Sequence, residues 1–336
     1  MKNKNKLIIL LLILLVFTTG CTKQLKDEKN KVVKNPNTGQ TLPSNILCAP
    51  TDKENIKLYN ETKEKLEKKY KNQLDKKEIT KTQYNKKIKK ITDISKLEKC
   101  KKFTPMSNGY EGLWTTFFVK TLSWVLIQIG TLVGNYGLGI ILTTLLIRLV
   151  LYPLTLKTAK QSEVLAKAKP ELDKLEKKYA GKNNQESMMK KSQEMMVIYK
   201  KYNINPLSGC IFAFLQIPLF LAFFEAMNRL PILFEDEFIF KLAMTPITGI
   251  QHHNYLYLLL PTLVALTTYF SFKLNKTATA GAGDQAKQMN TMMTVMTIMI
   301  IFMSFTMSTA IIFYWITNST FTIIQNLLVK RSMKKW

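Results

Sequence analysis

The chain has 336 residues, of which 46% are hydrophobic, and it carries a formal net charge of +26. Its mean hydropathy of -0.03 is close to that of a soluble protein, but this average combines a Lys-rich first third with a remainder whose apolar residues form runs of bilayer length. Such runs exclude a purely soluble protein, and no nucleic-acid-binding motif accompanies the basic charge, which argues against direct nucleic-acid binding.

The residues that would carry covalent chemistry are sparse. The four cysteines form no CxxC pair and there are only two histidines, so no metal site is expected. No Ser/His/Asp or paired-carboxylate constellation and no Walker-type phosphate loop is discernible. The sequence therefore predicts a protein that is not an enzyme and needs no cofactor.

The N-terminus has the features of a secretory signal in their usual order. Lysines precede an apolar run, and small residues follow it, so residues 1–20 are predicted to be a signal peptide. Cys21 then stands where the bacterial lipobox carries a lipid-modified cysteine, although Thr18 departs from the usual leucine. Acyl chains such as palmitate on Cys21 would hold the mature N-terminus on the outer face of the membrane. An uncleaved signal anchor is the alternative.

Residues 21–110 are predicted to form a polar, lipid-anchored extracytoplasmic domain. After a tether rich in Asn and Pro, residues 52–99 contain little Gly or Pro and place apolar residues at helical spacing. This pattern predicts two helices that break near Lys77. Cys48 and Cys100 bracket the hairpin. Because an antiparallel hairpin brings its ends together, and the outside of the cell permits disulfides, we predict a disulfide between them.

Residues 111–336 are predicted to form a membrane-embedded core. The first long apolar segment would be roughly 32 Å long as a helix, which is enough to cross a bilayer. The predicted spans are residues 136–156, 205–229, 255–272, 290–304 and 308–329. The apolar segment 113–133 carries Lys120 and Gln128, so it is predicted to be an amphipathic helix at the outer interface. A sixth span is the alternative.

The charges of the loops orient these spans. The loop at 157–204 and the tail after Val329 are rich in lysine, whereas the loop at 231–254 contains an acidic cluster. Short basic loops stay in the cytoplasm, which places the C-terminus inside and the N-terminus outside. The lipoprotein signal predicts the same orientation independently. The expected location is a bacterial cell membrane.

One charge lies deep inside a predicted span. Arg148 is roughly 13 Å from the cytoplasmic end of the first span, where a charge costs at least about 2.5–3.5 kcal/mol on insertion scales. No Asp or Glu is central in another span, so Arg148 is expected to face water; Thr144, Tyr152 and Thr155 share its helix face. Other spans also carry polar residues, which predict a hydrated groove or, alternatively, polar contacts between helices. These groove candidates are Gln216, Ser271, Tyr314, Trp315 and Asn318.

Three stretches resemble the YidC/Oxa/Alb family of membrane insertases. They are GNYGLGIILTTLLIRLVLYPLTLK at 134–157, YNINPLSGCIFAFLQIPLF at 202–220 and FYWITNSTFTIIQN at 313–326. The resemblance implies an all-α, five-span core with a hydrophilic groove that is open to the cytoplasm and to lipid but closed outside. It also implies that residues 157–204 form a cytoplasmic helical hairpin. The N-terminal domain lies outside the resemblance.

The resemblance also implies roles for particular residues. Arg148 matches the family's groove arginine, and Trp315 matches its groove-lining tryptophan. Ser271 departs from the glutamine that relatives often carry, the fourth span lacks the usual proline, and the short tail argues against tail-mediated ribosome binding. The implied function is an insertase and chaperone for nascent membrane proteins and lipoproteins. It would work among membrane lipids, alone or with the Sec translocon and the ribosome as further candidate partners.

Two other functions stay open at this point. A secondary transporter or channel for an anionic solute would use Arg148 as its binding charge, but that class usually shows inverted repeats, and none is discernible here. A lipid-anchored binding protein would instead use residues 21–110 as its active part. Function retained by a chain that ends at Leu113 would favour this second alternative.

Overall fold

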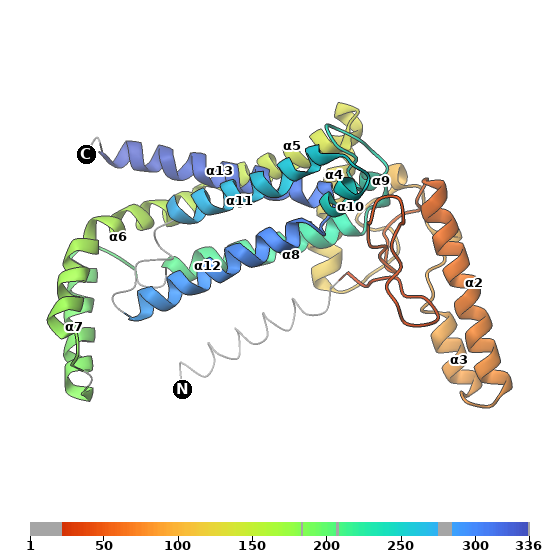
Figure 1. Ribbon diagram of the computed structural model, residues 1–336, viewed down its shortest axis with the longest axis horizontal. Helices are drawn as coiled ribbons and strands as arrows, with labels where there is room; N and C mark the ends of the chain where they lie inside the picture. The colour runs from red at the N-terminus through yellow and green to blue at the C-terminus, as the bar shows by residue number, and fades with distance from the viewer. Residues whose placement is uncertain (1–21, 183, 206–207, 275–283, 335–336) are drawn as a thin grey trace. The chain divides into compact units, whose positions relative to one another are not determined.

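The computed structural model describes residues 22–182, 184–205, 208–274 and 284–334 (Figure 1). Every regular element in these ranges is a helix, and the loops add isolated β-bridges, so the predicted all-α class is confirmed. The signal peptide at 1–20 and Cys21 lie outside the described residues. The chain divides into two compact units. The first is Met1–Thr143, Pro218–Leu258 and Thr306–Phe313; the second is Thr144–Ile217, Leu259–Phe305 and Tyr314–Trp336.

The predicted N-terminal hairpin is present in the first unit, where α2 (Lys53–Asp75) packs beside α3 (Lys81–Ile88) (Figure 1). A capping box of Thr80 and Gln83 begins α3, which satisfies amide donors that a helix start leaves unpaired. Lys77 has a φ of 56° and lies in the break between the helices, where the sequence predicts it. The helical part is shorter than predicted, because α3 ends at Ile88 and two 3₁₀ turns follow, η1 (Ile94–Lys96) and η2 (Cys100–Lys102).

The predicted tether at residues 22–50 is wrong, because these residues are folded. Leu25 and Leu42 are buried together with Tyr59 of α2, and the amide of Leu25 donates to the carbonyl of Leu42 at 2.7 Å. Tyr59 donates its hydroxyl to the carbonyl of Pro43 at 2.6 Å, and burial raises its pKa above the ordinary value. The apolar residues of this segment follow no helix or strand period, yet each gains roughly 1.5–3 kcal/mol when fully buried.

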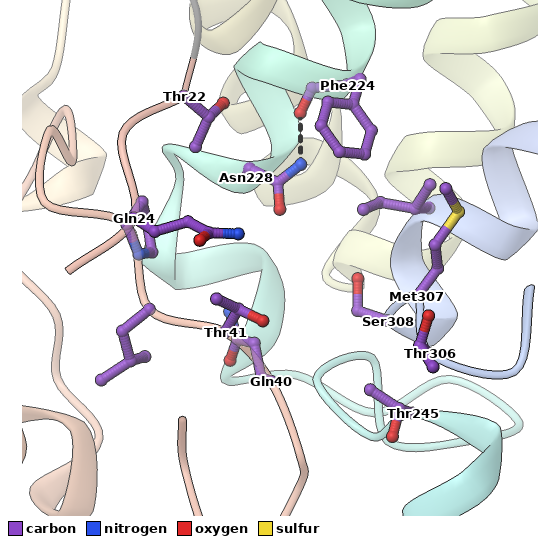
Figure 2. A pocket seen from close by; sticks show the side chains of 13 residues that line it. Thr22, Gln24, Gln40, Thr41, Phe224, Asn228, Thr245, Thr306, Met307 and Ser308 are labelled. Carbon is purple, nitrogen blue, oxygen red and sulfur yellow. Dashed lines mark hydrogen bonds between the residues drawn. The ribbon is translucent and has the colours of Figure 1, made fainter. Parts of the chain in front are cut away.

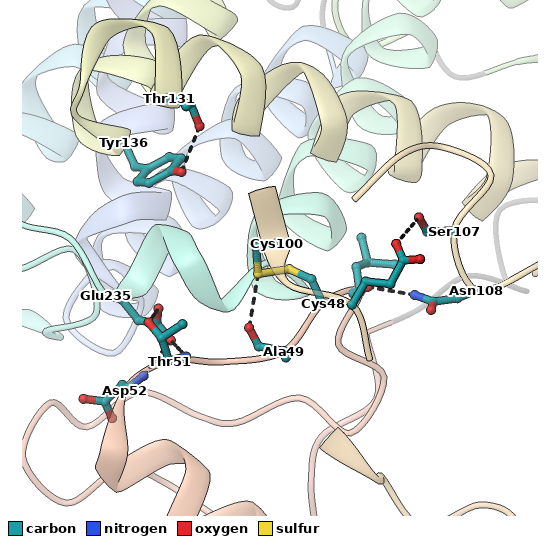
Figure 3. The surroundings of a disulfide bond; sticks show 12 residues. Cys48, Ala49, Thr51, Asp52, Cys100, Ser107, Asn108, Thr131, Tyr136 and Glu235 are labelled. Carbon is teal, nitrogen blue, oxygen red and sulfur yellow. Dashed lines mark hydrogen bonds between the residues drawn. A yellow bond between two sulfur atoms is a disulfide. The ribbon is translucent and has the colours of Figure 1, made fainter. Parts of the chain in front are cut away.

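Cys48 and Cys100 are joined by a disulfide, and both are buried (Figure 3). Residues close to Cys48 in the sequence also form hydrogen bonds. Asn108 donates its side-chain amide to the carbonyl of Leu47 at 2.7 Å, and the carboxylate of Glu235 accepts from the backbone amide of Asp52 at 3.0 Å. The base of the hairpin is thus held covalently and by polar contacts within the first unit.

A network of buried charges lies in the same unit. Arg229, which is 2% exposed, donates to Glu225 at 3.1 Å and to Glu111 at 2.6 Å. Lys120 is fully buried, and its ammonium lies 3.3 Å from Glu111. Trp114 donates its indole N–H to Glu225 at 3.2 Å. The sequence suggests that Lys120 marks the solvated face of an amphipathic helix. In the structure it is instead a buried charge that is paired with Glu111.

Two helical stretches of the described residues are long and apolar enough to cross a membrane. One is Trp114–Val133, composed of a π-helical turn (Trp114–Val119) and α4 (Lys120–Val133). The other is Tyr255–Leu274, composed of η4 (Tyr255–Leu258) and α11 (Leu259–Leu274). A third is counted if the bent pair α5 (Tyr136–Val150) and α6 (Tyr152–Tyr179) forms one span. The five-span topology and the interfacial position of 113–133 stay predictions.

The first predicted span, 136–156, is not one straight helix. It breaks at Leu151, and the axes of α5 and α6 differ by 71°. Pro153 is at the second position of α6, where it cannot donate to the carbonyl of Leu149 and its ring would clash there in a continuous helix. Arg148 therefore lies in the last turn of α5, whereas Thr155 belongs to α6.

Residues 152–201 form a hairpin of α6 and α7 (Gln185–Lys201) in the second unit (Figure 1). Leu165 and Leu172 of α6 are buried with Ile204, and Met195 of α7 packs against them. Ion pairs also link the two arms, among them Lys178 with Glu194 at 2.6 Å.

The remaining helices complete the chain. Their bounds are α8 (Ser208–Asn228), α9 (Pro231–Phe234), α10 (Pro246–Gln251), α12 (Asp284–Ser304) and α13 (Thr309–Lys334). α11 packs against α12. The apolar part of α12, Met293–Ser304, is shorter than a membrane span.

Candidate functional site

The second unit places Arg148 at the meeting point of three helices. Its Nε donates to Oδ1 of Asn318 on α13 at 2.7 Å, and its Nη2 donates to Oε1 of Gln216 on α8 at 3.1 Å. The guanidinium carbon lies 5.9 Å from the ring centroid of Phe321, within the range of a cation–π interaction. Three residues that the sequence separates widely are thus brought together.

The surroundings of Arg148 differ from the prediction in one respect. The sequence predicts that Arg148 faces water, but only 2% of it is exposed, because the two amide side chains and Phe321 enclose it. Among the described residues, its hydrogen-bond partners Asn318 and Gln216 are neutral. Neutral acceptors satisfy guanidinium donors and leave the positive charge uncancelled. The site is therefore a buried, hydrogen-bonded cation without a fixed counter-ion.

The other predicted site residues follow α13 and α11. Trp315 donates its indole N–H to Oγ1 of Thr268 on α11 at 2.9 Å. Ser271 is buried three residues beyond Thr268, and it is not among the hydrogen-bond or ring contacts of Arg148 described above. Tyr314 is fully buried and interacts electrostatically with Arg148. Arg148, Gln216, Asn318 and Tyr314 thus form one cluster, whereas Trp315 and Ser271 lie along the contact between α13 and α11.

A second polar link lies along the same helix. Gln325 of α13 donates its amide N–H to Oγ1 of Thr155 on α6 at 2.9 Å. Asn318, Thr322 and Gln325 recur at helical spacing, and all three are buried. This stripe continues the polar face from Arg148 towards α6, across the break at Leu151.

Phe321 is the contact that the sequence analysis missed. It lies three residues after Asn318, and residues with this spacing are neighbours on one helix face, so the spacing was the available signal. Nothing in the sequence distinguishes the apolar Phe321 within the polar stripe as a functional residue, because its role depends on the position of Arg148 beside its ring. The rings of Phe321 and Tyr152 also form an edge-to-face pair, with their centroids 6.5 Å apart.

The chemistry of the cluster is that of binding. Among the described residues that contact Arg148, none is a carboxylate, an imidazole or a thiol, so the cluster offers donors and a charge but no general base or nucleophile. A charge in a weakly polarisable interior acts strongly on an approaching opposite charge. Such an arrangement can attract and hold an anionic or strongly polar group.

Comparison with known proteins gives the family. A family model described as 60Kd inner membrane protein matches residues 128–335. The chain is 34% identical to membrane protein insertase YidC 2 of Listeria innocua over 231 residues, 68% of this chain and 76% of that protein. The chain belongs to the YidC/Oxa/Alb family of membrane protein insertases.

Two further relatives are also membrane protein insertases by name. Membrane protein insertase YidC 2 of Bacillus anthracis is 36% identical over 228 residues, 67% of this chain and 84% of that protein. Membrane protein insertase YidC of Oceanobacillus iheyensis is 34% identical over 233 residues, 68% of this chain and 88% of that protein. The family match includes Arg148 and the contacts described above, whereas the N-terminal domain at residues 21–110 lies before it. This family is not a family of enzymes, and its members belong to the membrane.

Proposed function

We propose that this protein inserts integral membrane proteins, and lipoproteins among them, into the membrane and helps them fold, with the Arg148 cluster as the site that receives a polar segment of the client. The observation that carries the proposal is the pairing of a buried arginine with two neutral amides. A permanent carboxylate partner would cancel the charge. Asn318 and Gln216 instead hold the guanidinium in place while leaving it available to an incoming anion.

The physical step is an exchange of hydrogen-bond partners. An acidic residue of a client displaces one amide oxygen, because a carboxylate can engage guanidinium with two charge-assisted hydrogen bonds. The low-dielectric surroundings strengthen this attraction. The apolar helix of the client then leaves for lipid as its apolar surface is removed from water. No nucleotide enters this scheme.

We further propose the arrangement in the membrane that the sequence predicts. Five spans place the N-terminus outside and the C-terminus and the α6–α7 hairpin in the cytoplasm, with Cys21 lipidated. The exposed methionines of α7, Met188, Met189 and Met196, are flexible apolar contacts suited to varied client helices. The Sec translocon and the ribosome are proposed partners of the same surface.

The test uses cells depleted of their own insertase and complemented with variants of this chain. Arg148→Ala is expected to lose insertion of a client with an acidic N-terminal tail at least tenfold, and Arg148→Lys to retain most of it because the charge remains. A matched client whose tail acids are changed to Asn and Gln is expected to depend far less on residue 148. Equal insertion of the acidic client by Arg148→Ala and the unaltered chain would refute the proposed role.

A further inference from the structure

The first unit contains a cavity of about 160 Å³ that the proposed insertase site does not use (Figure 2). Four separate segments of the chain line it. They are residues 22–43, the end of α8 at Phe224 and Asn228, the loop residue Thr245, and the turn and first residues of α13 from Thr306 to Ile311. The cavity therefore closes only when the N-terminal segment is folded against the rest of this unit.

Three buried polar atoms in this wall have no hydrogen-bond partner among the described residues. They are Oγ1 of Thr22, Oε1 of Gln40 and Oγ of Ser308, and all three residues line the same cavity. Gln40 and Ser308 are each 6% exposed. A buried polar group without a partner is destabilising, so three such groups at one cavity favour a bound molecule that supplies the missing hydrogen bonds.

The wall also defines the chemical class of that ligand. None of the described residues that line the cavity is charged, which disfavours an ion. The hydroxyls of Thr22 and Ser308 can donate or accept, and Oε1 of Gln40 can accept. Phe224, Met307, Ile311 and Leu42 supply an apolar side. A neutral group with ester carbonyls joined to methylene chains fits both the polar and the apolar part of the wall. The volume of the cavity equals that of about five water molecules.

We propose that this cavity holds the glyceryl ester group of a lipid, and that the lipid is the one attached to Cys21. Thr22 lines the cavity, and Cys21 is its immediate neighbour in the sequence, so a glyceryl group on Cys21 would be attached one residue from a residue of the cavity wall. The source of the lipid rests on the proposed lipidation of Cys21. The glyceryl ester of a free membrane lipid has the same chemistry and is the other source.

The experiment measures protection of a thiol placed in the cavity. Ser308→Cys is made in the full chain with Cys210→Ser, in lipidated protein and in a Cys21→Ala form that cannot be lipidated. The rate of reaction with a small uncharged methanethiosulfonate is measured in detergent, with and without dioctanoylglycerol. Ser95→Cys, at an exposed position of the same unit, is the control for reagent access. Intact mass reports independently whether Cys21 carries lipid.

The proposal predicts that the thiol at 308 reacts at least tenfold more slowly in the lipidated protein than in the Cys21→Ala form, and that dioctanoylglycerol slows the latter. Equal rates that dioctanoylglycerol slows in both forms support the glyceryl ester site with free lipid as its source. Equal rates without such an effect, or a thiol unreactive in both forms, overturn the site. Absence of lipid in the intact mass refutes the lipidation alone, and insertion activity is measured apart from all these rates.

Discussion

At the scale of single residues, Arg148 is kept charged and ordered by acceptors that do not neutralise it. Asn318 and Gln216 take two of its donors at 2.7 and 3.1 Å, and a guanidinium offers five. A client carboxylate can therefore displace one amide oxygen while the other amide still holds the guanidinium. Fixed acceptors also reduce the number of arginine rotamers, so the charge is held at one depth.

Asn318→Asp tests whether the uncancelled charge matters. The new carboxylate can form a charge-assisted pair with Arg148, so we expect thermal stability to be retained or raised while insertion of an acidic-tailed client falls at least tenfold. Asn318→Ala is the matched control, because it removes the amide without adding charge. It should cost about 1–3 kcal/mol of stability yet preserve more insertion than Asn318→Asp. The reverse order of insertion would contradict this account.

The buried pair of Arg229 and Glu225 gives a prediction about stability alone. Arg229→Met leaves Glu225 buried with its charge uncompensated by Arg229, and removal of one partner from a buried pair costs about 3–5 kcal/mol. Denaturant unfolding in detergent should show this loss. The double variant with Glu225→Gln should recover part of it.

An exposed pair supplies the comparison for Arg229. Lys68 and Glu64 are 73% and 64% exposed, so Lys68→Met should change stability by less than about 1 kcal/mol. Similar losses for Lys68→Met and Arg229→Met would show that burial does not set the energy of these pairs.

At the scale of elements, the methionines of the α6–α7 hairpin have two different roles, packing within the hairpin and forming an exposed apolar surface, which the sequence does not distinguish. Met195 packs against the buried Leu165 and Leu172, whereas its neighbour Met196 is 44% exposed. Successive residues of a helix point in different directions, so one arm can hold the hairpin together and still present an apolar surface.

This division predicts different outcomes for two adjacent substitutions. Met195→Ser should destabilise the hairpin, seen as faster amide hydrogen exchange across α6 and α7. Met196→Ser should leave exchange unchanged and lower crosslinking of apolar client helices to α7 several-fold. If Met196→Ser accelerates exchange as much as Met195→Ser does, the exposed methionines serve hairpin packing.

At the scale of the whole molecule, the disulfide ties together segments that are 52 residues apart. Closing a loop of that length restricts the unfolded chain and typically stabilises a protein by about 2–4 kcal/mol. Cys48→Ala with Cys100→Ala should lower the free energy of unfolding by that amount, and reductant should reproduce the loss in the unaltered chain. Intact mass under non-reducing conditions checks the bond itself. Two free thiols at Cys48 and Cys100 would contradict it.

Signals in the amino-acid sequence alone were sufficient to predict the all-α class, the family and the importance of Arg148. Apolar runs and helical spacing are local signals, so they predicted the α2–α3 hairpin with its break near Lys77. An arginine within an apolar segment can be recognised from the sequence whatever fold the chain adopts. Motifs around Arg148 and Trp315 were specific enough to indicate the insertase family, which the comparisons confirm.

The contacts of these residues depend on how distant segments of the chain pack together. The folding of residues 22–50 depends on apolar side chains without a period, and the pairing of Arg229 depends on acids supplied from other segments. The break at Leu151 divides a run that hydropathy reads as continuous. Arg148 was expected to face water because no acid was in sight, but amides on two distant helices enclose it. A hydropathy pattern shows that a charge lies in an apolar segment, where its burial is unfavourable. The acceptors that offset this cost come from other helices, so only tertiary packing brings them to the charge.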